Sequence, residues 1–445
     1  MTLLICYKDY CPKRAAMKIR LFYDGSEVDI EVPEDLRLVF IQPLSLSSRK
    51  TEDEIISDSL KRPINSPSLQ QLVQRYKSFL IIVNDHARGT PTPRLLKHVL
   101  PHLEYKKVGI IIASGTHSLP SEEDLKNLIL GEYYSQLRKL TVFHDSRATG
   151  QFIHLGTTTR GTEVRINRII NEYEAIITIN SIEPHYFAGF TGGRKSFLPG
   201  ISEFYSIESN HSMALLDESR ILVLKGNPLH EDLEEAAHFV AKTHPVFGIN
   251  VVLDGSDKIV GSFTGNLFEQ LYEGAELAKK VYAPPIREAP DILVSVVHSP
   301  LDQNLYQAQK GFENCLYAIK PGGIMILVAS CYEGIGPEDY EKMLQSANTR
   351  EELAAKFEEI KSNYQLGWHK VGSIPTFLED KELWMVTRIP EKKLKRMFIR
   401  GFEDPQKAID EAIKKLGSNC KVLIVQDSAN VSPVLEIDNR LDTQF

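Results

Sequence analysis

The stretch EPHYFAGFTGGRKSFLPG, residues 183–200, holds the densest group of chemically informative residues in this chain. It combines a histidine, several aromatic rings, four glycines and an Arg-Lys pair. It follows the apolar run EAIITINSI (174–182), which predicts a buried strand. Glycine-rich backbone after a strand exposes N–H groups that suit a phosphate. The spacing matches neither a Walker A loop nor the dinucleotide fingerprint, so the sequence leaves an anion-binding loop and a tight connection as alternatives.

Further apolar runs surround this stretch and predict an α/β fold. Buried strands are predicted at 78–85, 107–115 and 140–145, and helices with N-caps Thr92 and Ser121 are predicted at 92–104 and 121–137. Alternation of strand and helix is typical of a parallel sheet covered by helices. In such sheets, binding and catalytic residues gather in loops at the carboxyl ends of the strands.

The pattern repeats after a proline-rich, charged segment at 283–290, which is interpreted as a linker. We therefore expect two α/β domains with largely parallel sheets and an active site in the cleft between them. The predicted parts are an N-terminal extension (1–16), a first domain (17–283) that opens with a hairpin turning at Asp24-Gly25, a second domain (290–430) and a loosely ordered tail (431–445).

Composition narrows the class of protein. The chain has 445 residues and a net charge of -7, which argues against broad binding to nucleic acid or membrane surfaces. It has no apolar run near the roughly 20 residues that a membrane span requires. Five cysteines, a sparse and odd set, favour a reducing compartment. We expect a cytoplasmic protein.

Two residues of the opening stretch can do chemistry. His185 lies near the predicted strand end, and Lys195 lies among glycines and aromatic rings. A lysine in apolar surroundings can lose its charge and become a nucleophile. His117 follows the strand 107–115 and precedes a capped helix, a position suited to a general base.

Other loops add basic groups. The strand 78–85 is followed by Asp85, His86 and Arg88, and an arginine there could hold a carboxylate or phosphate. His211 falls in a predicted helix, and Gln307 and Lys310 share one face of a second-domain helix. Together these residues predict a site for a small anion with histidine acid/base chemistry, and they leave a bound metal open.

These motifs resemble those of the nickel-pincer lactate racemase family. EPHYFAGFTGGRKSFLPGI is similar to the family's E-P-H-F-F-A-G-[FY]-S-G-G-R-K signature, ASGTHSLPSEE to its G-x-H-R-x-x-[ST]-x-E-E loop, and NDHARGTPTP to its D-x-T-R-P-T-P loop. LYQAQKG and AIKPGG resemble its second-domain helix and turn. Two positions depart from the pattern: Ala87 stands in place of threonine and Ser118 in place of arginine. Both departures bear on the substrate more than on the type of reaction.

The resemblance implies an isomerase that uses nickel held by a pyridinium-3,5-bisthiocarboxylic acid mononucleotide, the nickel-pincer nucleotide. Lys195 would tether this cofactor covalently, and His211 would ligate the nickel. Asp85, His86, Ala87 and Arg88 would contact the cofactor. His117 and His185 would be the two acid/base residues, and Gln307 and Lys310, with Arg88, would bind the substrate carboxylate.

The implied reaction is racemisation or epimerisation of a 2-hydroxy acid by proton-coupled hydride transfer. Tyr186, Phe187 and Tyr306, as apolar walls, favour a lactate-like or aromatic acid, while malate or a sugar acid stays an alternative. The resemblance also implies cofactor-maturation enzymes as partners, and a homodimer is a further possibility. Two other classes stay open: a carrier that binds a nucleotide without turnover, and a zinc hydrolase using His117, His185 and His211.

Overall fold

The computed structural model describes residues 16–46 and 48–436. The chain divides into two compact units. One, here called the central unit, contains Ser45–Val281, and the other, the composite unit, contains the chain up to Leu44 and from Tyr282 onward. Both units contain a sheet dominated by parallel pairs, so the predicted fold class of two α/β domains with largely parallel sheets is confirmed.

The sheet of the central unit has the strand order β13-β12-β9-β4-β5-β6. All neighbours pair in parallel except β13, which is antiparallel to β12. The strands are β4 (Ser78–Asn84), β5 (Lys107–Ala113), β6 (Thr141–Phe143), β9 (Ala175–Ser181), β12 (Val246–Leu253) and β13 (Ile259–Gly265). Smaller antiparallel pairs are formed by β7 (Phe152–Thr157) with β8 (Glu163–Asn167) and by β10 (Pro184–His185) with β11 (Gly189–Phe190).

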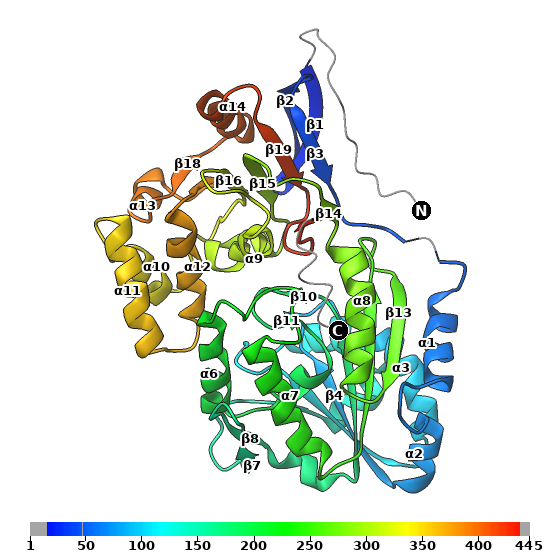
Figure 1. Ribbon diagram of the computed structural model, residues 1–445. Coiled ribbons are helices and arrows are strands. Elements are labelled where there is room, and N and C mark those ends of the chain that lie inside the picture. The colour runs from blue at the N-terminus through cyan, green and yellow to red at the C-terminus, as the bar shows by residue number, and fades with distance from the viewer. Residues whose placement is uncertain (1–15, 47, 437–445) are drawn as a thin grey trace. The chain divides into compact units, whose positions relative to one another are not determined.

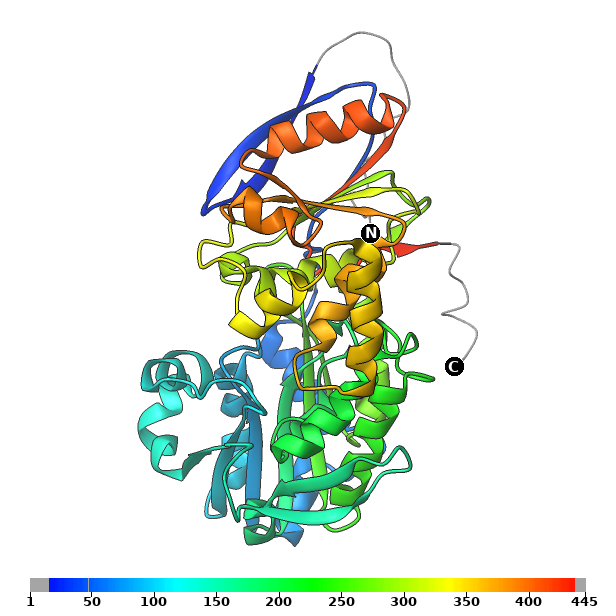
Figure 2. The same cartoon turned by 90° about the vertical axis from the view of Figure 1, so that its left-hand side faces the viewer.

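Helices surround this sheet and its small antiparallel pairs (Figure 1). They are α1 (Glu52–Lys61), α2 (Leu69–Arg75), α3 (Thr92–Val99), α4 (Glu122–Asp124), α5 (Tyr134–Leu137), α6 (Phe204–Ser212), α7 (Pro228–Ala241) and α8 (Glu269–Tyr282). Alternate residues of the central strands form one apolar core with α1, α2 and α3. The strand residues between them face the opposite side, which is covered by α8 and by the segment Gly193–Ser196, on which α7 packs (Figure 2).

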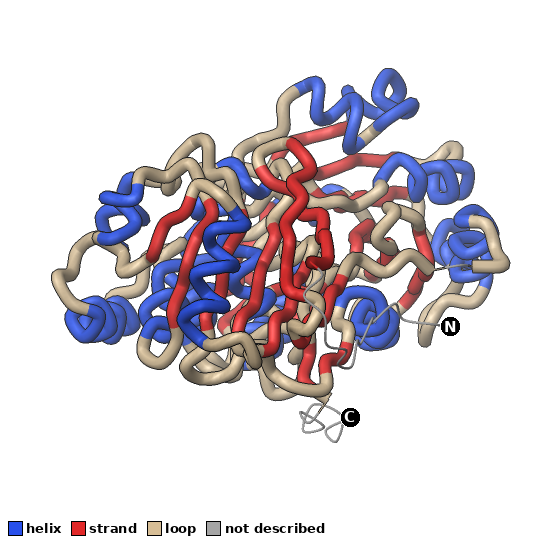
Figure 3. The backbone as a smooth tube through the Cα atoms, turned by 90° about the horizontal axis from the view of Figure 1, so that it is seen from above, coloured by secondary structure: helices blue, strands red, loops and turns tan. Residues whose placement is uncertain are grey.

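The composite unit holds a second sheet, in the order β18-β17-β16-β15-β19-β3, with every pair parallel. Its strands are β3 (Arg37–Ile41), β15 (Ile292–Val296), β16 (Ile324–Val328), β17 (Glu382–Val386), β18 (Arg400–Phe402) and β19 (Lys421–Val425). Its helices are α9 (Leu305–Cys315), α10 (Glu338–Leu344), α11 (Arg350–Ser362), α12 (His369–Leu378), α13 (Glu391–Lys395) and α14 (Pro405–Leu416). Figure 3 shows the strands of each sheet running side by side with helices around them.

The first strands of the chain belong to the composite unit, and the predicted first domain (17–283) is corrected on this point. β1 (Ala16–Tyr23) and β2 (Ser26–Pro33) form the predicted hairpin, with Asp24 and Gly25 both at positive φ in its turn. The hairpin packs on β15, β16 and α14, and β3 pairs with β19. Apolar alternation shows that a strand exists, but it does not name the sheet that the strand joins.

Local predictions succeeded where the caps are strong and failed where backbone geometry intervened. Ser121 forms a capping box with Asp124, as predicted. Thr92 is not an N-cap, because α3 follows Pro91 without a side-chain cap. The helix predicted over 121–137 is broken into short segments, and Gly131 at φ 56° interrupts it.

The predicted N-terminal extension and C-terminal tail can be compared with the structure only in part. Residues 1–15 of the predicted extension and 437–445 of the predicted tail lie outside the described residues. Ala16 already belongs to β1. The tail is ordered at β20 (Val434–Leu435), which pairs with β14 (Pro285–Ile286) and so fixes residues expected to be loose. No helix within the described residues is long and apolar enough to cross a membrane.

The place of the hairpin yields a testable prediction. Leu21 is fully buried against the composite-unit sheet, so Leu21→Ala should cost about 2–5 kcal/mol of unfolding free energy. Hydrogen exchange should show reduced protection in β15 and β19, with β4 and β9 unchanged. Tyr105→Ala, at a side chain that is 95% exposed, is the control. A loss of protection confined to β4 and β9 would contradict this assignment of the hairpin.

Candidate functional site

Three adjacent strands of the central unit bring the predicted site residues together. β5, β4 and β9 are neighbours in the sheet and run in the same direction. Their carboxyl ends lead into the loops that contain His117, Asp85–Arg88 and His185. Parallel pairing therefore places segments that are far apart in the sequence along one edge of the sheet.

His117 forms a pair with Asp85. The Nδ1 atom of His117 lies 2.7 Å from Oδ2 of Asp85, and the carboxylate is buried while the imidazole is 44% exposed. An ionised carboxylate only accepts hydrogen bonds, so Nδ1 carries the ring proton. Nε2 is then the basic nitrogen, which suits His117 to accept a proton from a ligand. Asp85 thus orients His117, a contact that the sequence did not predict.

A chain of hydrogen bonds joins the loops after β4 and β9. Asn84 Nδ2 donates to Thr90 Oγ1 over 2.7 Å, and Thr90 Oγ1 lies 2.8 Å from Ser181 Oγ. The Ser181 hydroxyl donates to Oε1 of Glu183 over 3.0 Å. These side chains fix Glu183 relative to the loop of Arg88.

The glycines of residues 189–193 are required by packing against the protein itself. Gly189 has φ 73°, and a Cβ there would lie 2.0 Å from the carbonyl oxygen of Val223. Gly192 has φ 90°, and its Cβ would lie 2.9 Å from Oδ1 of Asn250. The glycines therefore allow the loop backbone to approach the backbone of Val223 and the side chain of Asn250 closely, a role that the interpretation as a phosphate cradle did not include.

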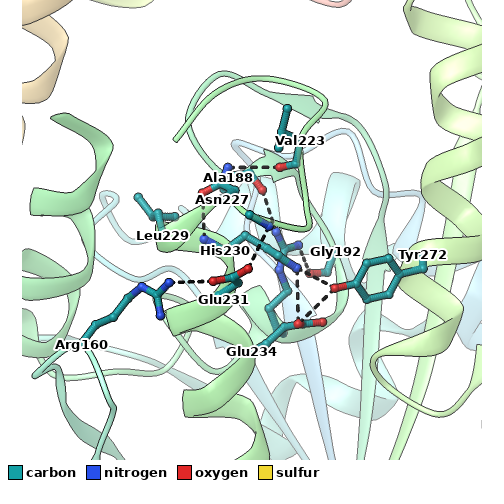
Figure 4. A network of polar contacts seen from close by, with 12 residues as sticks. Arg160, Ala188, Gly192, Val223, Asn227, Leu229, His230, Glu231, Glu234 and Tyr272 are labelled. Atoms are coloured by element: carbon teal, nitrogen blue, oxygen red, sulfur yellow. Dashed lines mark hydrogen bonds and ion pairs between the residues drawn. The ribbon is translucent and has the colours of Figure 1, made fainter. Parts of the chain in front are cut away.

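Arg194 is a structural residue inside this loop. Its guanidinium is fully buried and donates to the carbonyl oxygens of Ala188, Thr191 and Gly192 over 2.8, 3.1 and 3.2 Å. Burial lowers the pKa of Arg194 to about 10, and the nearby Glu234 opposes this shift. Figure 4 shows the surrounding network, with Ala188 and Gly192 near His230, Glu234 and Tyr272.

The loop that contains Lys195 is held by polar residues of β9 and β12. Asn250 Oδ1 accepts from the backbone N–H of Gly193 over 3.2 Å, and Asn180 Oδ1 accepts from the Ser196 hydroxyl over 3.1 Å. Both asparagines are buried in the sheet. A short 3₁₀ helix, Gly193–Ser196, thus presents Lys195.

The amine of Lys195 is electrostatically unusual. Burial lowers the pKa of Lys195 well below its ordinary value, and the positive charges of Arg88 and Arg194 lower it further. The carboxylate of Glu183 acts in the opposite direction but is outweighed. Such an amine loses its proton more readily than a surface lysine and can act as a nucleophile.

The ring of Phe187 is the centre of the site. It lies 4.4 Å from the ring of His185 and 5.1 Å from that of His211, centroid to centroid, and 5.6 Å from Nζ of Lys195. His211 lies near the end of α6, in the predicted helix. The structure therefore gathers three of the predicted residues around one nearly buried aromatic ring.

His185 is held in a defined orientation. Its ring stacks on Tyr186 at 5.1 Å with an interplanar angle of 9°. The backbone N–H of Ala188 donates to Nδ1 over 3.4 Å, which favours the ring proton on Nε2. His185 and His117 thus favour opposite tautomers.

The other predicted residues lie in two places. His86 and Arg88 are half-buried in the loop after β4, and Ala87 is exposed there. Gln307 and Lys310 lie on α9 of the composite unit, where Asn304 caps the helix by accepting from the Gln307 N–H over 3.0 Å. Their contact with a substrate stays a prediction, as does the active site between the units.

The donor set bears on the kind of metal site. The described ranges 16–46 and 48–436 contain no group of three or more His, Cys, Asp or Glu side chains placed to hold a metal ion. A zinc hydrolase using His117, His185 and His211 would need such a group. A single imidazole such as His211 fits a metal whose other donors come from an organic cofactor.

Several residues of the site escaped sequence reasoning. Asn180, Ser181 and Asn250 hold the loops from inside apolar strands, and Phe187 was predicted only as a wall. Polar residues within the runs IITINS and FGINVV were the available signal, because a buried amide needs a specific partner.

The chain is similar to known proteins over most of its length. Residues 23–222 match the family described as "Lactate racemase N-terminal domain", and residues 287–432 match "Lactate racemase C-terminal domain". The chain is 32% identical to the lactate racemase of Lactiplantibacillus plantarum over 343 residues, covering 75% of this chain and 80% of that protein. It is 29% identical over 424 residues to the lactate racemase of Thermoanaerobacterium thermosaccharolyticum, covering 93% and 98%.

Solved structures show the same relationship. The lactate racemase apoprotein from T. thermosaccharolyticum superposes with a TM-score of 0.85 at 27% identity, covering 94% of this chain and all of that one. A Thermotoga maritima protein shares the fold, with a TM-score of 0.66 at 18% identity over 87% and 98% of the two chains. The chain therefore belongs to the lactate racemase family and is, by that membership, an isomerase of the racemase class.

Proposed function

We propose that this protein racemises a small 2-hydroxy acid, with lactate as the leading substrate, by means of a nickel-pincer nucleotide attached to Lys195. The observation that carries the proposal is the arrangement around Phe187, whose ring contacts His185, His211 and the amine of Lys195. The relatives named lactate racemase support the substrate.

The residues present fit this cofactor. The lowered pKa of Lys195 favours the uncharged amine that a covalent tether requires. His211 offers one imidazole, and the half-buried Arg88 offers a cation for an anionic nucleotide. When bound, the nickel-pincer nucleotide would supply the acceptor for the hydrogen on the carbon that bears the hydroxyl group.

The histidines would handle the hydroxyl proton. Asp85 keeps the proton of His117 on Nδ1, so that Nε2 can accept the substrate's hydroxyl proton. His185 would perform the same task for the mirror-image substrate. Tyr186 and Ala188 keep its ring in place for this task.

The substrate carboxylate needs cationic or amide partners. We propose Arg88, Gln307 and Lys310 for this role. The aromatic rings of Tyr186 and Phe187 favour a short apolar tail, as in lactate, over a sugar acid. Malate and an aromatic 2-hydroxy acid stay as alternative substrates.

A carrier without turnover is the second candidate. The buried carboxylate of Asp85 aligned on His117 argues against it, because binding alone does not require an oriented base. Loss of catalysis on replacement of His117 would distinguish a racemase from a carrier.

The charge state of Lys195 can be measured in the unloaded protein. Its folded-state pKa lies below that of the unfolded chain, so the unfolded state binds more protons and the unfolding free energy rises with pH up to about 10.4. Lys195→Met should therefore stabilise the protein at about pH 7, and the gain should shrink towards about pH 10. Urea unfolding at both pH values measures this. Lys225→Met, at an exposed lysine, is the control, and a pH-independent gain would contradict the shift.

The proposed covalent attachment at Lys195 and the proposed nickel ligand His211 can be tested separately by measuring what the protein contains. In protein matured with the cofactor-building enzymes, intact mass should show an adduct on Lys195 and elemental analysis should show nickel. Lys195→Ala should lose the adduct, whereas His211→Ala should keep the adduct and lose most of the nickel. Lys225→Ala should retain both. An active parent protein with neither adduct nor nickel would refute the proposal.

The two histidines should behave asymmetrically. Replacing His117 or His185 by alanine should lower racemisation by ~10²–10⁴-fold, the usual cost of losing a general base. Each variant should still show a single-turnover change in cofactor absorbance with one pure enantiomer only. Asp85→Asn should resemble the loss of His117, since it disturbs the tautomer. His154→Ala, at an exposed histidine, is the control.

The same measurements identify the substrate and test the mechanism. Lactate, malate, phenyllactate and gluconate should be compared as pure enantiomers, and we expect the largest response with lactate. Racemisation at the parent rate by either histidine variant would exclude the two-base mechanism.

A further inference from the structure

We propose that Asp232 is a positioning residue for His211: it holds the neighbouring Asn210 and thereby fixes the end of α6. This inference rests on the proposed function, in which His211 ligates nickel. It adds a residue of α7, a helix to which the sequence motifs gave no role.

Asp232 is a fully buried carboxylate with a complete set of donors. Oδ1 accepts from the Thr158 hydroxyl over 2.5 Å. Oδ2 accepts from the Thr162 hydroxyl over 2.9 Å and from Asn210 Nδ2 over 2.8 Å. Within the described residues, no ion pair of Asp232 is formed, so neutral donors alone compensate its buried charge.

The donor from α6 is the residue directly before His211. Asn210 is fully buried, and its Nδ2 also donates to the Leu229 carbonyl over 3.2 Å. Its Oδ1 accepts no hydrogen bond from the described residues, so the Asn210 amide binds α7 through Nδ2. The first turn of α6 is fixed separately, because Ser206 bonds to Glu163 and Arg165 of β8. The clamp by Asp232 is thus a polar anchor at the end of α6 where His211 lies, beside the 3.3 Å contact of Ser209 with Thr162.

The first residues of α7 also hold the other side of the site. Asn227, its N-cap, donates through Nδ2 to the Phe187 carbonyl over 2.9 Å and to the Val223 carbonyl over 3.1 Å. Figure 4 shows Asn227 beside Ala188 and Val223, at the start of the helix that continues through His230. One rigid helix therefore fixes both the Phe187 segment and, through Asp232, the helix of His211.

A metal ligand on a helix end gains from such a support. Residues that orient a ligand through hydrogen bonds typically contribute 10–100-fold to metal affinity. His211 touches Phe187, while Lys195 lies on a different loop. A loosened α6 should therefore weaken nickel retention without removing the adduct on Lys195.

Two single-donor variants provide the test. Asn210→Ala and Thr158→Ala each delete one hydrogen bond to Asp232, but only Asn210→Ala breaks the link to α6. In matured protein we expect Asn210→Ala to release nickel to a chelator at least about 10-fold faster than the parent, with the adduct intact by mass. Thr158→Ala should release nickel at close to the parent rate. Urea unfolding of both unloaded variants should show similar losses of stability.

Asp232→Asn tests the carboxylate itself. It should also release nickel about 10-fold faster, whereas Asp254→Asn, at a buried carboxylate that caps the β12–β13 turn, should not. Equal nickel release by Asn210→Ala, Thr158→Ala and the parent would overturn the proposed role of Asp232 alone. Fast release by Thr158→Ala as well would also overturn it, since general destabilisation would then explain the effect. A parent protein without adduct and nickel would overturn the proposed function, and this inference with it.

Discussion

Parallel pairing of β9, β4 and β5 is the constraint on which the site depends. Because the three strands are adjacent and run the same way, their carboxyl ends fall on one edge of the sheet. The loops that follow contain His185, Asp85 and His117. Nothing in those loops alone would bring a carboxylate of one within 2.7 Å of an imidazole of another.

The same sheet also supports the loop that contains Lys195. Asn180 and Asn250 lie in otherwise apolar strands and accept hydrogen bonds from Ser196 and Gly193 of the loop. This support holds an amine in a place where burial and two guanidinium groups disfavour its charge. The stability lost by burying such groups is offset by their hydrogen bonds. The lowered pKa of the lysine thus arises from tertiary packing.

The contrast between Arg194 and Lys195 illustrates this. The two residues are adjacent basic side chains in one glycine-rich loop. Arg194 turns into the protein and satisfies three carbonyl oxygens, whereas Lys195 approaches Phe187. Their roles differ because the guanidinium can donate several hydrogen bonds at once, while the amine can be deprotonated.

The sequence by itself predicted the strands β4, β5, β6 and β9, several helices and the family of the chain. Apolar runs and Ser121 as a cap predict local structure because periodicity and capping act within a few residues. The motifs with Lys195 and His211 identified the family because they are contiguous segments. The assignment of 17–44 to the first domain was wrong, since β3 pairs with β19, a strand near the other end of the chain.

Only the tertiary structure decided which residues support the predicted site residues. The contacts of Asp85 with His117 and of Asp232 with Asn210 join residues from different elements. Hydrophobic periodicity says which face of a strand or helix is buried, but it does not say which buried polar atoms meet across elements. These contacts between buried polar atoms follow from strand order and helix packing, which depend on the whole chain.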